Sequence, residues 1–333
     1  MKALVLEDKN QPLLLKEVPD PVPLGDQVLV RVHAAAFNRR DYWIRVGRYA
    51  GLKYPIILGS DAAGIVVGTA AERDSAWIGR EAVINPGIGW GGSASHQHAK
   101  EFKILGLPDD GTFAQYVIVS ASNLHPKPEH LNWEESAAIP LAGLTAYRAL
   151  VSRARLQPGE KLLICGIGGG VALFGLQFAT AIGALSYVTS SSEEKIHRAR
   201  ELGAAGGVNY RNDQWSDALK SMAGPFDVIL DGSGGANFNR ILDLAAPGGR
   251  VVIYGATMGN APETELRRVF WKQLNILGST MGSPEDFGSM LDLIRRNRIH
   301  PVIDSVFPLE DGESGMQKLG ESKQCGKIVI QTA

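Results

Sequence analysis

The spacing of apolar residues changes at about residue 123, and the two spacings predict two kinds of domain. Up to that point, short segments alternate apolar and polar positions between Gly and Pro, which is typical of strands in antiparallel sheets. The clearest predicted strands are residues 28–37, 62–70, 81–85 and 113–119. One helix is predicted among them, at residues 39–47 (RRDYWIRVG).

From Trp133 onward, predicted helices and strands alternate along the chain. The predicted elements are a helix at 134–154, strands at 228–234 and 249–257, and a helix at 237–245 between those strands. This order is typical of a doubly wound parallel sheet. The last stretch predicts a helix at 284–299 and strands at 302–309 and 326–333, and we expect it to return to the first domain.

The predicted fold class is therefore α/β, with a Rossmann doubly wound parallel sheet and a second domain rich in strands. We predict that residues 1–123, completed by about 295–333, form the strand-rich domain, and that residues 124–294 form the Rossmann domain.

Residues 161–195 have the order of a dinucleotide-binding βαβ unit: a strand, a glycine-rich turn at 166–170, a helix and a second strand. Glycines let the backbone approach a pyrophosphate, and the N–H groups of the helix N-terminus face its charge. Two registers of the G-x-G-x-x-G pattern stay open, one starting at Gly166 and one using Gly168, Gly170 and Ala172. The cofactor contacts predicted here are Gly168, Gly169, Gly170 and Val171.

The end of the second strand predicts which dinucleotide is bound. NAD sites place an acidic residue there, whereas this strand ends Thr189-Ser190-Ser191-Ser192, and Lys195 follows. An acid would repel a 2′-phosphate, and hydroxyls with an ammonium would hold it. Ser190, Ser191 and Lys195 therefore predict NADP(H).

The composition of the chain indicates which partners and which cellular compartment to expect. The 333 residues carry a net charge of −1, which predicts neither a nucleic-acid nor a membrane partner. With two cysteines, no basic segment ahead of an apolar one at the start and no run of about 18 apolar residues, a cytoplasmic protein is expected.

Several segments together resemble the medium-chain dehydrogenase/reductase superfamily. They are MKALVLED, FNRRDYWIRVG, PIILGSDAAGIVVG, DGTFAQYV, AAIPLAGLTAYRAL, the glycine turn and LGAAGGVNY, in the family order. The resemblance implies a GroES-like β-barrel catalytic domain beside the Rossmann domain, and hydride transfer with a nicotinamide cofactor.

The chain departs from the zinc enzymes of that family at the metal positions. Where those enzymes bring a Cys, a His-Glu pair and a second Cys, this sequence has Asn38, Ser60-Asp61 and Leu141. Zinc is bound by thiolate, imidazole or carboxylate, so we predict no metal. The region of the structural zinc lobe has no cysteine, and its His96 and His98 are expected to be loop residues. The chain is thus similar to the zinc-free NADPH:quinone oxidoreductase (zeta-crystallin-like) branch.

Without a Lewis acid, substrates that delocalise the added charge are favoured, namely quinones and α,β-unsaturated carbonyls. We therefore predict a zinc-independent NADPH-dependent oxidoreductase acting by direct hydride transfer on a small molecule. Two alternatives stay open: reduction of plain aldehydes or ketones, and a non-catalytic NADPH-binding protein.

The resemblance also implies the site residues. Asn38, Trp43 and Thr145 are expected at the reacting groups, with Asn38 orienting the substrate oxygen. The expected substrate pocket consists of Asn38, Tyr42, Trp43, Tyr49 and Ser60. Further cofactor contacts are expected from Thr145, Tyr210, Tyr254, Gly255, Gly278, Ser279 and Lys327. Relatives commonly dimerise through edge strands of the dinucleotide domain, so a homodimer is expected, and either a side chain or solvent supplies the proton.

Overall fold

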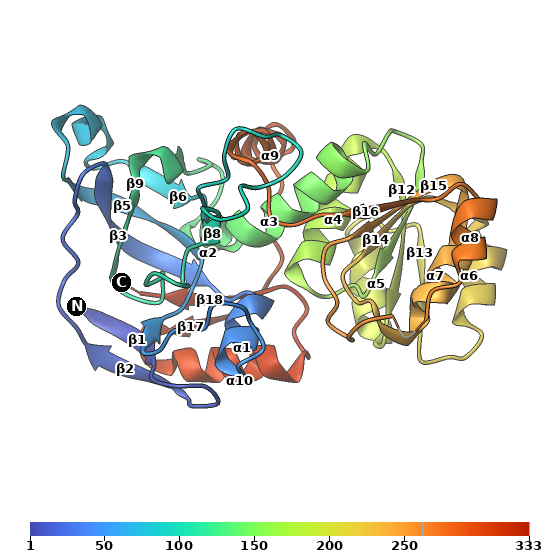
Figure 1. Cartoon of the computed structure of the whole chain (residues 1–333), viewed down its shortest axis with the longest axis horizontal. Coiled ribbons are helices and arrows are strands. Elements are labelled where there is room, and N and C mark those ends of the chain that lie inside the picture. Colours follow the sequence, from blue (N-terminus) through green and yellow to red (C-terminus); the bar gives the residue numbers. More distant parts are fainter. Residues whose placement is uncertain (262, 333) are drawn as a thin grey trace. The chain divides into compact units, whose positions relative to one another are not determined.

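The computed structural model describes residues 1–261 and 263–332, and Figure 1 shows their helices and strands. They form two compact units. Unit 1 contains residues 1–142 and 282–333, and unit 2 contains residues 143–281. Among the described residues, no helix combines the length and the apolarity that a membrane span requires.

Unit 1 is rich in strands, as the alternating pattern predicts. Its strands are β1 (Lys2–Leu6), β2 (Leu13–Glu17), β3 (Gln27–Ala36), β4 (Ile56–Ile57), β5 (Asp61–Thr69), β6 (Glu81–Ile84), β7 (Gly87–Ile88), β8 (Lys103–Ile104), β9 (Tyr116–Ser120), β10 (Leu124–Pro126), β17 (Ile303–Pro308) and β18 (Lys327–Gln331). The main sheet has the order β10-β6-β5-β3-β18-β17, and β9 also pairs with β3. A second sheet has the order β2-β1-β4.

Five helices belong wholly or partly to unit 1: α1 (Arg39–Arg45), α2 (Trp133–Ala138), α3 (Pro140–Tyr147), α9 (Pro284–Asn297) and α10 (Gly312–Glu321). Short helical turns occur at Glu72–Trp77, Ala121–Asn123 and Leu309–Asp311. The start of α9 shows how the sequence fixes a boundary. Ser283 caps this helix, and Pro284 occupies its first turn. The carboxylate of Asp286 accepts a hydrogen bond from the Ser283 N–H.

The C-terminal strand completes the sheet that the N-terminal half begins. β18 pairs antiparallel with β3, Val329 opposite Ala36 and Gln331 opposite Ala34. Residues 282–333 belong to the same compact unit as residues 1–142. This pairing brings Lys327, the first residue of β18, toward the end of β3, where Phe37 and Asn38 follow.

Unit 2 is the predicted doubly wound sheet, with parallel strands in the order β13-β12-β11-β14-β15-β16. Its strands are β11 (Lys161–Cys165), β12 (Leu185–Ser190), β13 (Gly206–Asn209), β14 (Phe226–Asp231), β15 (Ala245–Ile253) and β16 (Asn275–Gly278). Its helices are α4 (Gly170–Ile182), α5 (Glu193–Glu201), α6 (Trp215–Ala223), α7 (Phe238–Leu244) and α8 (Leu266–Trp271), with turns at Arg148–Arg153 and Gly235–Asn237. The chain reverses direction across the sheet between β11 and β14, which is where such folds bind nucleotides.

Both faces of this sheet are covered, because successive residues of a strand point to opposite sides. On one face, Leu163 of β11 and Ile229 of β14 share a buried cluster with residues of α6 and α7. On the other face, α4 lies so close to β14 that a β-carbon on Gly175 would be 2.7 Å from Leu230 Cδ2. The α/β class with a Rossmann sheet is therefore confirmed.

Two details differ from the sequence prediction. The helix predicted at 134–154 is three pieces, since α2 ends at Ala138, α3 starts at Pro140, and a wider π-type turn follows at Arg148–Arg153. Proline has no N–H to donate and is favoured in a first turn, so Pro140 starts a new helix. The compact units divide after Ala142 and after Met281, whereas we expected boundaries after 123 and 294. The reason is that α2 packs on β3, β5 and β18, and Phe287 of α9 packs on His125.

Candidate functional site

The glycine turn of unit 2 has the backbone that a phosphate-binding loop requires. Gly166 and Gly168 have φ values of 74° and 126°, a region that residues with a β-carbon rarely adopt. A β-carbon on Gly166 or Gly169 would meet nothing within 4 Å. The turn is anchored to β12, because the N–H groups of Gly166 and Ile167 donate to the hydroxyl and carbonyl oxygens of Thr189. Helix α4 then begins at Gly170. Its first N–H groups have no partners within the helix, so the loop fits a pyrophosphate.

Neither register of the glycine pattern identifies the residue that packs α4 on the sheet. Val171 is half-buried in the first turn and Ala172 is buried, but the closest approach to β14 occurs at Gly175. A glycine one helical turn past the expected position was visible in the sequence. We missed it because the pattern was read with fixed spacing.

The residues predicted to select NADP(H) gather at the carboxyl end of β12. Ser190 is buried, and its hydroxyl donates to the carbonyl of Ile167 in the glycine turn, while Ser191 is half-buried. The half-buried side chain of Lys195 crosses that turn, so a β-carbon on Gly168 would lie 3.3 Å from Lys195 Nζ. Tyr210 follows β13, and its N–H donates to the Ser190 carbonyl. An ammonium and hydroxyls are thus placed beside the glycine turn, and Tyr210 is joined to the end of β12 through its backbone.

The residues expected to flank the nicotinamide lie at the same edge of the sheet. Tyr254 and Gly255 follow β15, Gly278 ends β16, and the N–H of Ser279 donates to the carbonyl of Ile253. The Ser279 hydroxyl is buried and has no hydrogen-bond partner among the described residues. Thr145 is buried in α3. Apart from Thr145, the predicted cofactor residues of unit 2 therefore lie at the carboxyl edge of the parallel strands.

Asp231, which the sequence analysis did not single out, organises the centre of that edge. It is fully buried at the end of β14, where its carboxylate accepts bonds from Ser233 and from the Gly234 N–H. Burial, together with Asp231 and Cys165, raises the pKa of the Tyr254 phenol. Burial likewise raises the pKa of the Cys165 thiol, so Cys165 has the environment of a packing residue.

In unit 1, Asn38, Asp61 and Lys327 form one buried network. Lys327 Nζ donates to the Phe37 carbonyl at 2.7 Å, to Asn38 Oδ1 at 2.7 Å and to Asp61 Oδ2 at 2.9 Å. Asn38 Nδ2 donates to the same Asp61 Oδ2 at 2.9 Å, and the Leu141 N–H donates to Asp61 Oδ1 at 2.8 Å. Asp61 is 0% exposed, Lys327 4% and Asn38 5%. The structure thus places the ammonium of Lys327 between the two side chains, although the sequence predicted a cofactor contact for it.

A second buried cation lies beside the network. Arg40 is 7% exposed, and its guanidinium donates to the Ser60 hydroxyl and the Leu105 carbonyl and lies over the Tyr49 ring. The Ser60 hydroxyl in turn donates to Leu105. Ser60 and Tyr49 were predicted to line the substrate pocket, and both are engaged by Arg40. The sequence showed two adjacent arginines at 39–40 but nothing that marked one as buried.

Helix α1 begins after Asn38 and carries two of the predicted aromatic pocket residues, Tyr42 and Trp43. Asp41 accepts a 2.7 Å bond from the Asn38 N–H, and complete burial raises the pKa of Asp41 to about 6. Tyr42 packs on α10, where a β-carbon on Gly320 would lie 2.8 Å from its ring. Trp43 meets the Tyr42 ring edge-on at 5.4 Å. The two predicted aromatic pocket residues therefore contact each other.

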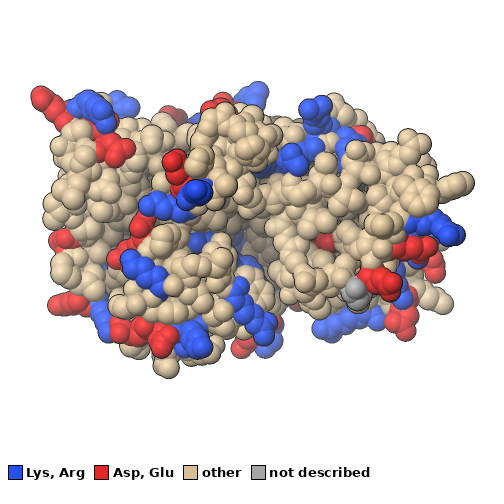
Figure 2. All heavy atoms as spheres, in the orientation of Figure 1, with Lys and Arg blue, Asp and Glu red and all other residues tan. Residues whose placement is uncertain are grey.

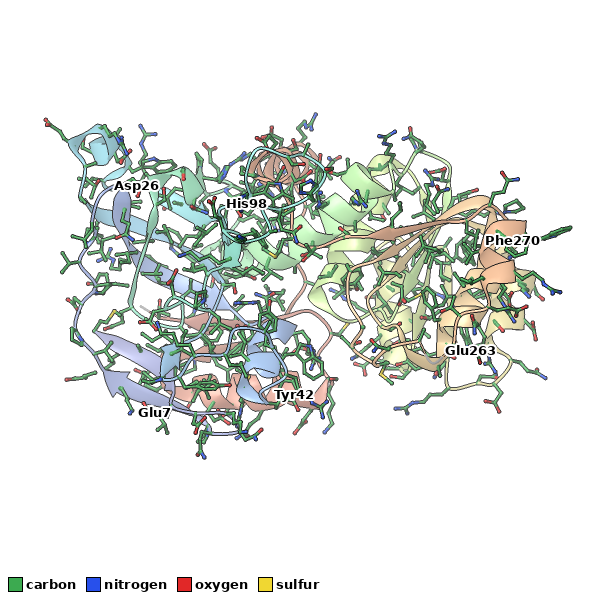
Figure 3. All side chains as sticks on the ribbon, viewed as in Figure 1. Glu7, Asp26, Tyr42, His98, Glu263 and Phe270 are labelled. Atoms are coloured by element: carbon green, nitrogen blue, oxygen red, sulfur yellow. The ribbon has the colours of Figure 1, made fainter. Side chains whose placement is uncertain are left out.

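The side chains that commonly bind metals are dispersed among the described residues. Among the described residues, no three His, Cys, Asp or Glu side chains are grouped so as to hold a metal ion. His98, which Figure 3 labels, accepts the backbone N–H groups of Lys100 and Glu101 through Nδ1, so it organises its own loop. His96 contacts the carbonyl of Gln97.

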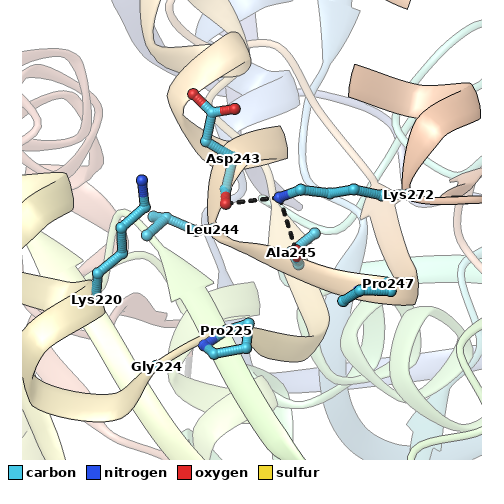
Figure 4. A pocket seen from close by; sticks show the side chains of 8 residues that line it. All are labelled: Lys220, Gly224, Pro225, Asp243, Leu244, Ala245, Pro247 and Lys272. Carbon is cyan, nitrogen blue, oxygen red and sulfur yellow. Dashed lines mark hydrogen bonds between the residues drawn. The ribbon is translucent and has the colours of Figure 1, made fainter. Parts of the chain in front are cut away.

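A pocket of about 350 Å³ lies at the opposite edge of the unit 2 sheet, where β14 and β15 begin (Figure 4). Its wall includes Pro225, Lys220 and Lys272. Lys272 Nζ donates to the carbonyls of Leu242, Asp243 and Ala245 and so caps the end of α7. These contacts give Lys272 a structural role, and the pocket contains none of the predicted site residues.

Charges of both signs are interspersed on the face drawn in Figure 2, consistent with a net charge of −1. The predicted site residues of unit 1 lie on or beside helix α1 and the buried network, and those of unit 2 lie mainly at the carboxyl edge of its sheet.

Comparisons with known proteins cover both units. Residues 25–129 match the family model "Alcohol dehydrogenase GroES-like domain", and residues 170–296 match "Zinc-binding dehydrogenase". The chain is 36% identical over 339 residues to the "Zinc-type alcohol dehydrogenase-like protein YogA" of Leptosphaeria maculans, covering 96% of this chain and 94% of that protein. It is 29% identical over 343 residues to the quinone oxidoreductase of Homo sapiens, covering 99% and 97%. A crystal structure of an NAD-dependent alcohol dehydrogenase matches with a TM-score of 0.93 at 35% identity, covering 100% of both chains.

Proposed function

The chain belongs to the medium-chain dehydrogenase/reductase superfamily of oxidoreductases, and we propose that it is a zinc-independent, NADPH-dependent reductase of quinones or α,β-unsaturated carbonyl compounds. The observation that carries the proposal is that the carboxylate oxygens of Asp61 already accept hydrogen bonds from protein donors. Asp61 is the one residue with a zinc-binding side chain at the positions matching the catalytic metal ligands, and both its oxygens are bonded to protein donors. Zinc would have to displace a buried ammonium to reach it.

The dinucleotide would be held by the glycine turn and by the residues at the carboxyl edge of unit 2. When bound, its reduced nicotinamide supplies the hydride. Lys195 beside Gly168 supports NADP(H), because an ammonium there suits a 2′-phosphate and β12 ends without an acid. The matching crystal structure is of an NAD-dependent alcohol dehydrogenase, so we propose the preference for NADP(H) on the basis of this chain's own residues.

In unit 1, Asn38 is the group that we assign to the substrate oxygen. A charge that is spread over an enolate or a hydroquinone anion needs less stabilisation than a localised alkoxide, so a single neutral donor is sufficient for it. Trp43 has an N–H but no acidic proton, which supports protonation of the product by solvent.

Metal analysis and turnover assays test the proposal together. The purified protein is expected to contain well under one zinc per chain and to oxidise NADPH with quinones or enones at a rate that chelators leave unchanged. Stoichiometric zinc, with turnover lost to a chelator and restored by zinc, would show that the metal assignment is wrong.

The similarity to zinc-type alcohol dehydrogenase-like proteins favours a second candidate, the reduction of aldehydes or ketones. The same NADPH assay separates the two when simple aldehydes are compared with enones of equal size. Faster turnover of the aldehydes would replace our proposal by this one. Tight NADPH binding without turnover of any acceptor would indicate a non-catalytic protein.

We also propose that the chain forms a homodimer through the edge strand β16 and the neighbouring α8. On α8, Leu266, Phe270 and Trp271 are 70%, 65% and 81% exposed, and Ile276 of β16 is 39% exposed; Figure 3 labels Phe270. An edge strand with apolar neighbours is a template for pairing with a second copy. Analytical ultracentrifugation is expected to show a dimer that Trp271→Asp weakens at least about tenfold. A wild-type monomer at micromolar concentration would contradict this.

A further inference from the structure

The buried network around Asn38 leaves one hydrogen-bond donor unused. An ammonium has three N–H groups and Lys327 has three acceptors within 2.9 Å, so its donors are fully occupied. The Asn38 amide accepts from Lys327 and gives one of its two N–H groups to Asp61. The second N–H of Asn38 Nδ2 has no partner among the described residues.

The network also fixes which way the Asn38 amide points. If the amide were rotated by half a turn, its NH2 group would face the Lys327 ammonium and its oxygen would face the Asp61 carboxylate. Donor would then meet donor at the Lys327 end, and acceptor would meet acceptor at the Asp61 end, inside a site from which water is excluded. The ammonium on one side and the carboxylate on the other therefore allow a single orientation.

Lys327 also balances the charge of Asp61. The two groups are 2.9 Å apart and almost completely buried. Without the ammonium, a carboxylate would face the region where the substrate oxygen gains negative charge. With it, the pair is neutral, and the remaining Asn38 N–H can bind that oxygen without opposition.

We infer that Lys327 is a positioning residue for the proposed reduction, holding the Asn38 amide so that its unused N–H binds the substrate oxygen. This inference rests on the proposed function. Because the ammonium has no donor left, it acts through Asn38 and does not itself touch the substrate. One fixed neutral donor suits acceptors whose product anion is delocalised.

Kinetics of a charge-balanced variant test the inference. Asp61→Asn/Lys327→Met removes both charges and is expected to lower kcat about 100-fold. Adding Asn38→Ala to this variant is expected to lower kcat by no more than about threefold further, because residues that act as a unit are non-additive. The KM for NADPH is expected to change less than about twofold. Asp61→Asn alone gives the reference for the lost carboxylate.

The matched control is Lys323→Met, four residues earlier, whose side chain is 77% exposed; its kcat is expected to equal that of the wild type. Three results would overturn the inference. The first is an unchanged kcat in the charge-balanced variant. The second is an Asn38→Ala substitution that lowers kcat by the same factor in this variant as in the wild type. The third is a variant in which only the KM for NADPH rises. The last would restore Lys327 as a cofactor contact.

A second readout does not depend on turnover. In protein labelled with ¹⁵N at asparagine, the side-chain amide of Asn38, assigned by its loss in Asn38→Ala, is expected to exchange with solvent at least about tenfold more slowly than in the charge-balanced variant. Equal exchange would show that Lys327 does not hold the amide. A wild-type protein inactive with every acceptor would defeat the proposed function, whereas slow exchange in that protein would still support the positioning by Lys327.

Discussion

Lys327→Met is expected to lower the free energy of unfolding by about 3–5 kcal/mol, because it leaves the carboxylate of Asp61 buried without a counter-charge. Asp61 is 0% exposed, and it would keep only the Asn38 amide and the Leu141 N–H as partners. Denaturant unfolding followed by tryptophan fluorescence would measure the change, with the wild type and the variant compared under identical conditions.

The double variant Asp61→Asn/Lys327→Met separates charge from packing. Removing both charges of a buried pair is often close to neutral, so it is expected to regain more than half of the lost stability. Lys323→Met, on the surface, should stay within about 0.5 kcal/mol of the wild type. A loss below about 1 kcal/mol in Lys327→Met would show that its ammonium does not lie beside Asp61.

Lys195→Ala is expected to weaken NADPH binding about 10- to 100-fold and to change NADH binding less than about twofold. A hydrogen bond to a charged group contributes about 1.5–3 kcal/mol, and NADH has no 2′-phosphate to lose it. Dissociation constants of both dinucleotides, measured by fluorescence titration, would show the difference. Lys220→Ala is the matched control, since Lys220 lies at the opposite edge of the same sheet. Equal weakening of the two dinucleotides would mean that Lys195 contacts a part they share.

The fold around the predicted cofactor residues could be predicted from the sequence because its determinants are local. Glycines in a turn, a helix start and the last residues of a strand lie within about 35 positions of one another, in the segment 161–195. The structure gathers them at one sheet edge together with Tyr210, Tyr254 and Gly278. The ends of helices and strands were harder to predict. The break at Pro140 was missed because a run of helix-forming residues continues across it and hides the change of helix axis.

The contacts of the predicted substrate residues could not be predicted from the sequence, because their partners are distant in sequence. Lys327 is 266 positions from Asp61, and only the pairing of β18 with β3 brings them together. Lys327 was therefore interpreted by similarity, as a cofactor contact. Arg40 was missed for a related reason, because its partners Ser60 and Leu105 come from separate loops. Whether a cation is buried depends on which segments pack together, and the periodicity of apolar residues does not predict this packing.

The interleaved course of the chain has a consequence for biosynthesis. Because β18 is inserted beside β3, the first unit to be translated is the last to be finished. Unit 2 is continuous and can fold before β18 is translated, whereas Asp61 meets its counter-ion only after Lys327 has emerged from the ribosome. A nascent chain stalled before residue 327 would thus carry a folded unit 2 and an unfinished unit 1 that is open to chaperones.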